Sequence, residues 1–153
     1  MAMRAPSAKH VVMASVLVAA AAVPGCGYSP VGSIGPIRNL LDQREWALAP
    51  LEALTVDVRI PGSGTGTGTV DATAEWTHAS DDINLYVTAT GCTPEMFAAQ
   101  RCGFKARADG PTAKPERLSF DVSGGDSYRI WIVNAGPGRE TGTFVANVVI
   151  TYP

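Results

Sequence analysis

The side chains of this chain that are best suited to chemistry are one histidine and a set of scattered carboxylates. His78 is the only histidine after residue 10, so any serine–histidine–aspartate arrangement in the body of the chain must include it. No Gly-x-Ser-x-Gly motif is present, and His78 stands in a polar turn where we expect it to be exposed. The carboxylates mostly occupy solvent-facing positions, which does not suit a glycosidase pair. We therefore expect no enzyme, with an unrecognised active site as the alternative.

Three oxygen-bearing side chains, Asp81, Asp82 and Asn84, stand together where a strand is expected to begin. Ca²⁺ takes six to eight oxygen ligands, so these three side chains alone would hold it weakly. The alternative is a turn in which Asp81 hydrogen-bonds to its own backbone. We expect no resident cofactor and keep these residues as a weak calcium candidate.

The first 25 residues have the organisation of an export signal. Arg4 and Lys9 precede an uncharged apolar run at residues 11–23. As a helix this run would span about 20 Å, against about 30 Å for the hydrocarbon core of a bilayer. It ends in Val23-Pro24-Gly25-Cys26, which resembles the lipobox of bacterial lipoproteins. An ordinary cleaved signal with a free cysteine, and a short buried helix, are the alternatives.

The lipobox resemblance implies that Cys26 becomes the first residue after cleavage and carries a diacylglyceryl group and an acyl chain such as palmitate. Two or more chains give stable anchoring, so membrane attachment would need no other contact. Gly27, rather than the aspartate that resembles a retention signal, follows the cysteine. The resemblance therefore implies the outer membrane in a Gram-negative cell and the outer face of the plasma membrane otherwise.

With Cys26 lipidated, Cys92 and Cys102 are the only remaining pair. An exported protein is in an oxidising compartment, which favours a disulfide. A zinc site, a redox pair and two free thiols are the alternatives. The spacing is not Cys-x-x-Cys, and a zinc site lacks ligands because His78 is the only histidine after residue 10. The net charge is −2 with no Lys/Arg run, so we expect no nucleic-acid partner.

The chain after the signal is long enough for one domain. Residues 26–37, rich in Gly, Pro and Ser, are typical of a flexible tether that follows the lipidated cysteine. Residues 38–48 place leucines at helical spacing, which predicts a short amphipathic helix ending at Pro50, so that the helical segment is 38–50. We expect the β-sandwich domain to cover residues 53–153.

From Leu54 onward apolar and polar residues alternate with period two, the pattern of half-buried strands. Gly, Pro, Asp and Ser turns separate the segments, which predicts an all-β, antiparallel β-sandwich. The expected strands are 54–60, 70–76, 83–89, 118–122, 128–133 and 144–151. Residues 90–116 form a long connection that contains the cysteine pair and one expected helical turn beginning near Pro94.

The same alternation turns Tyr86, Arg129 and Trp131 away from the core. If they are exposed, they form a candidate ligand surface for a protein or a glycan. The alternative is that the 38–48 helix or the 90–116 connection covers them.

Residues 69–152 resemble the pre-peptidase C-terminal (PPC) β-sandwich domain, a jelly-roll-like fold found beside secreted bacterial proteases. The resemblance lies in residues 81–87 (DDINLYV), 123–132 (SGGDSYRIWI) and 142–144 (GTF). It implies a domain that binds protein or polysaccharide surfaces. Asn84 in place of the family's second acid and the Cys92–Cys102 segment depart from the pattern.

These observations predict a non-catalytic cell-envelope lipoprotein, attached to the membrane by its lipid anchor, whose β-sandwich binds a protein or glycan partner. A structural component of an envelope assembly and an accessory to a secreted hydrolase are the alternatives.

Overall fold

The computed structural model describes residues 35–111 and 114–153. The predicted signal, the lipidation site Cys26 and most of the predicted tether lie outside these residues. None of the helices in the described part combines the length and apolarity needed to cross a bilayer.

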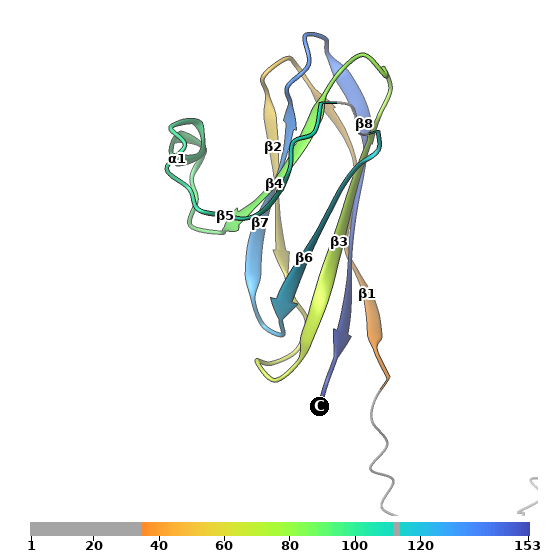
Figure 1. Ribbon diagram of the computed structural model, residues 1–153, viewed down its shortest axis with the longest axis vertical. Helices are drawn as coiled ribbons and strands as arrows, with labels where there is room; N and C mark the ends of the chain where they lie inside the picture. Colours follow the sequence, from red (N-terminus) through yellow and green to blue (C-terminus); the bar gives the residue numbers. More distant parts are fainter. Residues whose placement is uncertain (1–34, 112–113) are drawn as a thin grey trace, which may run out of the picture. The chain divides into compact units, whose positions relative to one another are not determined.

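Two four-stranded antiparallel sheets pack face to face, which confirms the predicted all-β sandwich (Figure 1). Sheet A has the strand order β1-β8-β3-β6, and sheet B has the order β2-β7-β4-β5. The strands are β1 (Ile37–Leu48), β2 (Ala53–Arg59), β3 (Thr67–Trp76), β4 (Ile83–Ala89), β5 (Phe104–Ala108), β6 (Glu116–Ser123), β7 (Ser127–Asn134) and β8 (Glu140–Thr151). One helix, α1 (Pro94–Ala98), joins β4 to β5.

The six strands expected from alternation are all present, and their inward residues form the core. Beta-branched and aromatic residues suit this pleated, half-buried surface, and burying them provides the main driving force for folding. The most deeply buried include Val70, Ile83, Leu85, Val87, Ile130, Ile132, Phe144 and Val148.

The predicted helix over residues 38–50 is wrong, because this segment is strand β1. It pairs antiparallel with β8 along its whole length, and the pairing shifts register between Leu40 and Asp42. Leu41 is therefore an extra residue in a bulge, which breaks the alternation and places leucines side by side as in a helix. Trp46 and Leu48, beyond the bulge, are buried at strand spacing. The sandwich consequently begins at Ile37, at the end of the predicted tether, and not at residue 53.

Strand β5 was also not expected. It lies within the predicted 90–116 connection and pairs with β4 from Leu85↔Ala108 to Thr88↔Phe104. Its core-side residues are the small Ala106 and Ala108, so the sequence carries no strong apolar alternation there.

Candidate functional site

The first candidate site is a projection, defined as residues 90–103, that lies on the outer side of sheet B (Figure 1). A disulfide between Cys92 and Cys102 closes it, with the two Cα atoms 5.7 Å apart, which confirms the predicted pairing. Thr93 caps α1 by accepting a hydrogen bond from the Met96 amide at 3.3 Å, and Pro94 occupies the first turn. The predicted helical turn near Pro94 is thereby confirmed.

An aromatic cluster of Tyr86, Phe97, Phe104 and Trp131 fixes the projection to the sheet. Phe97 of α1 stacks on Trp131 of β7, with ring centroids 4.1 Å apart and an interplanar angle of 13°. Tyr86 meets Phe97 edge-on at 5.5 Å and lies 5.3 Å from Phe104. The indole Nε1 of Trp131 donates to Thr88 Oγ1 at 2.9 Å, so its polar atom is also satisfied. The cluster acts as a second, smaller core outside the sandwich.

Trp131 is therefore not part of an exposed ligand surface, because only 2% of it is accessible. The predicted outward direction of Tyr86, Arg129 and Trp131 is correct; Trp131 follows the alternative in which a segment covers it, whereas Tyr86 and Arg129 are half-buried. The cover comes from the 90–116 connection, since residues 38–48 form a strand of the other sheet. The alternation of a strand predicts on which side of the sheet a side chain lies. Whether that side chain is exposed depends on contacts made by a segment distant in sequence.

Arg129 ties the base of the projection to the sheet. Its Nε and Nη2 donate to the two carboxylate oxygens of Asp57 at 2.6 and 2.7 Å, and its Nη1 donates to the Cys92 carbonyl at 2.8 Å. The guanidinium lowers the pKa of Asp57, so the pair persists below the usual pKa of an aspartate. Arg129 thus uses three of its five N–H donors on two residues of the protein, Asp57 and Cys92.

The surface that remains accessible is a rim formed by Phe104, the first residue of β5, by the edge of Tyr86 and by the outer turn of the projection. Phe104 is 41% exposed beside the half-buried ring of Tyr86, whose pKa is raised chiefly by burial. The outer turn of the projection adds exposed side chains, among them Glu95, Gln100 and Arg101. An apolar ring surrounded by polar residues on a rigid support is typical of a contact site for another molecule.

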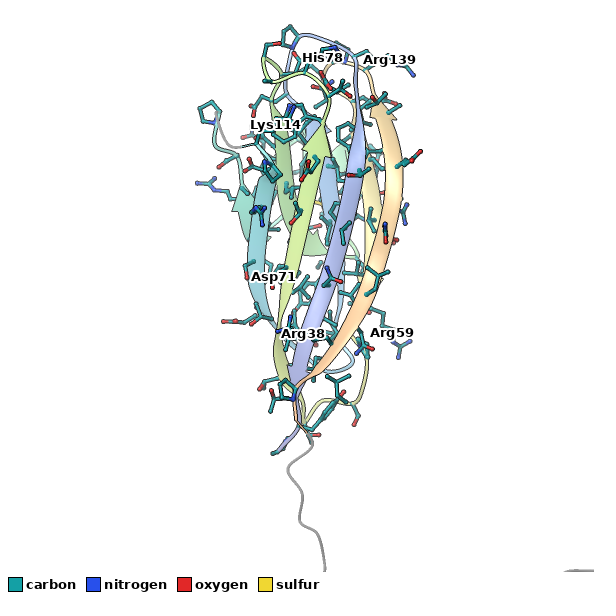
Figure 2. All side chains as sticks on the ribbon, turned by 90° about the vertical axis from the view of Figure 1, so that its right-hand side faces the viewer. Arg38, Arg59, Asp71, His78, Lys114 and Arg139 are labelled. Carbon is teal, nitrogen blue, oxygen red and sulfur yellow. A yellow bond between two sulfur atoms is a disulfide. The ribbon has the colours of Figure 1, made fainter. Side chains whose placement is uncertain are left out.

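A second group of chemically capable residues, the terminal cluster of His78, Asp81 and Glu140, lies at one end of the sandwich. Figure 2 shows His78 at the end opposite Arg38. Glu140, at the start of β8, is fully buried, and it accepts hydrogen bonds from the Thr77 amide at 3.0 Å and the His78 amide at 3.2 Å. His78 Nδ1 lies 2.6 Å from Glu140 Oε1, and the exposed position predicted for His78 is confirmed.

Asp81 completes the terminal cluster. The neighbouring Glu140 carboxyl raises the pKa of Asp81, chiefly through a side-chain hydrogen bond and then through burial. Of the three predicted calcium ligands, only Asp81 joins this cluster. Asn84 lies with Tyr86 on the outward side of β4, buried, and its Oδ1 has no hydrogen-bond partner in the described residues. Sequence reasoning missed Glu140, because it follows His78 by 62 positions and no motif connects them.

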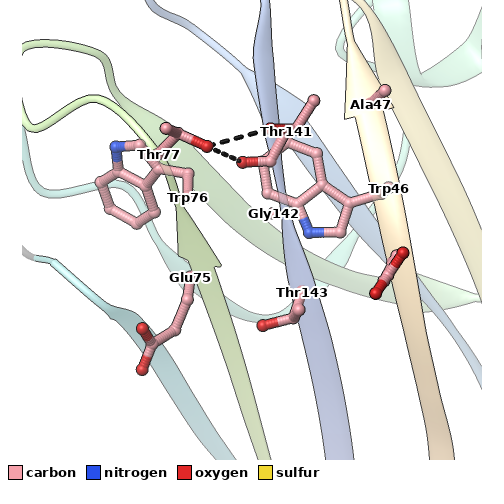
Figure 3. A pocket seen from close by; sticks show the side chains of 9 residues that line it. Trp46, Ala47, Glu75, Trp76, Thr77, Thr141, Gly142 and Thr143 are labelled. Carbon is pink, nitrogen blue, oxygen red and sulfur yellow. Dashed lines mark hydrogen bonds between the residues drawn. The ribbon is translucent and has the colours of Figure 1, made fainter.

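A third feature is an open groove on sheet A (Figure 3). Gly142 of β8 lies between Trp46 of β1 and Trp76 of β3, which are its register partners on the two sides. The outward side chains around it are small or acidic, and Thr77 Oγ1 hydrogen-bonds to the Thr141 carbonyl at 3.0 Å. Both indoles face inward and are largely buried, so they offer no aromatic platform to a ligand.

Comparisons with known proteins add little to this geometry. No protein-family model matches the chain, and no curated protein matches it. Among solved structures, it is similar to PliG, a periplasmic inhibitor of g-type lysozyme from Aeromonas hydrophila, with a TM-score of 0.46, 15% identity, and coverage of 77% of this chain and 88% of that one. It is also similar to a structure of infectious bursal disease virus, Gx strain, with a TM-score of 0.45, 11% identity, and coverage of 85% of this chain but 38% of the viral one. Both likenesses are too distant to carry an argument about function.

Proposed function

We propose that this chain is an exported lipoprotein, anchored through Cys26, that binds a protein partner with the rim of its disulfide-closed projection. The binding surface comprises Phe104, the exposed edge of Tyr86 and the outer turn of the projection around Gln100. The observation that carries the proposal is the covalent and aromatic fixation of this segment on the outside of sheet B. A fixed projection loses little conformational entropy when it binds, which is the usual advantage of preorganisation.

The shape of the site favours a protein over a glycan. A sugar ring stacks on the open face of an aromatic side chain, but Phe97 already occupies a face of Trp131, and Tyr86 and Phe104 pack against Phe97. What remains exposed is a rim in which the phenyl ring of Phe104 stands among polar neighbours. Such a rim fits a depression on a protein surface, where a single aromatic residue often supplies a large part of the binding energy.

The anchor completes the proposal. The lipobox-like Val23-Pro24-Gly25-Cys26 places the modified cysteine eleven residues before the first strand residue, Ile37. The sandwich would then be held at the cell envelope by lipid alone, because acyl chains suffice for stable attachment. The PPC resemblance agrees with a binding role, and membership of that family remains part of this proposal.

Site-specific photo-crosslinking in cells tests the binding surface. A photoreactive amino acid replaces Gln100 on the projection or, as a matched control, Ser119, which is exposed on the outer face of sheet A. We expect a discrete protein adduct from position 100 that is absent from position 119 and is weakened at least tenfold by Phe104→Ala. Equal adducts at both positions, or an adduct insensitive to Phe104→Ala, contradict the proposal. Binding to a glycan array that Phe104→Ala abolishes, without any protein adduct, would identify a glycan partner instead.

Membrane fractionation tests the anchor separately. Cys26→Ser should move the protein from the membrane fraction to the soluble fraction, because the acylated residue is lost. An unchanged membrane fraction in Cys26→Ser would show that the lipid is not the anchor, whatever the result of the crosslinking.

A further inference from the structure

The terminal cluster brings together three side chains whose chemistry suits a metal ion. One ligand atom from each of His78, Asp81 and Glu140 lies within 4.8 Å of the other two. One imidazole and two carboxylates are a ligand set that Zn²⁺ and related first-row ions accept, with a fourth position left for water. Ca²⁺ is less suited, because it prefers six to eight oxygen atoms and does not favour imidazole.

The backbone around Asp81 leaves room for its carboxylate. A Cβ atom on Gly136 would lie 2.8 Å from Asp81 Oδ1, and a Cβ on Gly138 would lie 2.6 Å from Oδ2. Any side chain at either glycine would therefore displace Asp81 from the cluster. The Gly138 amide also points to Asp81 Oδ1 at 3.4 Å. The absence of side chains at Gly136 and Gly138 thus leaves the space in which the Asp81 carboxylate lies beside Glu140.

Two carboxyl groups that share a buried position need a proton or a cation between them. Glu140 is fully buried and Asp81 nearly so. Their ligand oxygens lie within 4.8 Å of each other, and two ionised carboxylates this close would repel each other strongly. The Thr77 and His78 amides already orient Glu140, as outer hydrogen bonds orient the ligands of metal sites. A divalent ion between the two carboxylates would neutralise both charges.

We propose that His78, Asp81 and Glu140 bind one divalent first-row transition-metal ion, with Zn²⁺ as the representative ion, at the end of the sandwich opposite Arg38. The ion takes its fourth ligand from solvent, since the His78 side chain is 65% exposed and the site is open on that side. It links the turn between β3 and β4 to the first residue of β8. This inference is independent of the projection and of the proposed function.

The imidazole of His78 has to move for a tetrahedral ion to enter. Two ligands of a tetrahedral Zn²⁺ at about 2.0–2.1 Å lie about 3.3 Å apart. His78 Nδ1 and Glu140 Oε1 are now 2.6 Å apart, so the imidazole must withdraw by about 0.7 Å. An exposed side chain on a turn makes that adjustment without disturbing the core.

Zinc titration of the purified full chain, produced without a histidine tag, tests the site. We expect one Zn²⁺ per chain by competition with a chromophoric chelator, and a Zn²⁺-dependent rise in melting temperature. His78→Ala and Asp81→Asn should each weaken binding at least about 100-fold. Asp82→Asn is the matched control, which removes the neighbouring acid, and should change affinity less than about twofold.

The visible absorption of bound Co²⁺ distinguishes metal binding by His78 from a purely structural role of that residue. Bound at the cluster, it should show the intense visible absorption of a four- or five-coordinate ion in wild type and in Asp82→Asn, and lose it in His78→Ala. Zn²⁺ affinity equal in wild type and His78→Ala, or no saturable binding up to about 1 mM, would overturn the proposal. Binding of Ca²⁺ without Zn²⁺ would overturn it as well, because that result would indicate an all-oxygen site.

Discussion

The outer faces of the two sheets differ although the same alternation produces both. Sheet A turns short polar and charged side chains to solvent, among them Asp71, Glu75, Arg117, Ser119, Asp121, Thr141, Thr143 and Asn147. Sheet B turns Trp131 and Thr88 outward, yet both are buried beneath the projection and its aromatic ring partners. One face is an ordinary solvated surface, and the other is the floor of a small second core.

This difference shows where stabilising contacts lie in each sheet. Sheet A depends on the close fit of its inner side, where Trp46 and Trp76 approach Gly142. Sheet B depends in addition on a segment outside the sandwich, held by a disulfide and by Arg129. Substitutions in sheet A should therefore change global stability, whereas substitutions at the projection should also uncover a specific tryptophan.

The largest effect is expected in sheet A, from Gly142→Ala. A Cβ at position 142 would lie 1.8 Å from the Glu75 carbonyl oxygen and 2.5 Å from Trp46 Cζ2. Since the nearest atom is backbone in an adjacent strand, β3 and β8 would have to separate locally. We expect a loss of about 3 kcal/mol or more in the free energy of unfolding, measured by denaturant titration.

Gly64→Ala is the matched control, because a Cβ at position 64 meets no atom within 4 Å. It should change the free energy of unfolding by less than about 1 kcal/mol in either direction. Equal effects of the two substitutions would show that the inner side of sheet A is more adaptable than its geometry indicates.

On sheet B, the largest effect is expected from replacing Cys92 and Cys102 together by serine. The disulfide closes a short loop, with a sequence separation of 10, and the chain-entropy estimate for such a loop is about 2.5–3 kcal/mol. Loss of the disulfide should also let α1 leave Trp131. We expect increased acrylamide quenching and a red shift of tryptophan emission under conditions where the sandwich stays folded.

The signal can be assigned to one residue, because Trp46 and Trp76 are buried in the sandwich and should not respond. Adding Trp131→Phe to the cysteine variant should abolish the new quenching. An unchanged emission spectrum in the cysteine variant would mean that the aromatic contacts alone hold the projection in place.

The sequence predicts most of the sandwich for a physical reason. Two-residue alternation reports directly which side chains of a strand face the core, and the six strands expected from it are confirmed. Strand β1 is not predicted by alternation, because the bulge at Leu41 shifts the pattern of apolar residues by one position in the first half of the strand. Strand β5 is not predicted either, because its core-facing residues, Ala106 and Ala108, are too small to give a clear apolar alternation.

The candidate sites are predicted less completely, since they depend on contacts between distant segments. Spacing and compartment indicate the Cys92–Cys102 pair, but no local pattern shows that Phe97 stacks on Trp131. Likewise, the oxygen-bearing side chains of Asp81, Asp82 and Asn84 make Asp81 a weak calcium candidate, while Glu140 joins it only through the turn between β7 and β8. Local sequence identified several members of each site, and the fold supplied Glu140 of the terminal cluster and Phe97 of the aromatic cluster.

A smaller effect on sheet B is expected from Phe97→Ala. The substitution removes the ring stacked on Trp131 at 4.1 Å and its contact with Tyr86. Because Phe97 is only partly buried, we expect a loss of about 1.5–2 kcal/mol, below the range for a fully buried phenylalanine. Trp131 should become accessible to acrylamide with the disulfide intact, as mass spectrometry of the intact chain would verify.

Phe104→Ala is the control for Phe97→Ala, since Phe104 belongs to the same cluster but its ring packs against Tyr86 and Phe97 and not on Trp131. It should leave Trp131 protected and cost less stability. If both substitutions expose Trp131 equally, the cluster behaves as one unit and the direct stack has no special role.

The smallest effect is expected from Arg129→Lys. A lysine keeps the charge opposite Asp57 but lacks the planar fork that reaches both carboxylate oxygens and the Cys92 carbonyl together. The pair is partly exposed, so the loss in unfolding free energy should be only about 0.5–1 kcal/mol. Hydrogen exchange of amides 92–101 should nevertheless quicken, because the link between the strand and the base of the projection is weakened. Arg117→Lys, at an exposed position of β6 on the uncovered face of sheet A, should leave that exchange unchanged. If Arg129→Lys leaves it unchanged too, the disulfide and the Phe97–Trp131 stack are sufficient to hold the projection, and the difference between the two faces rests on them alone.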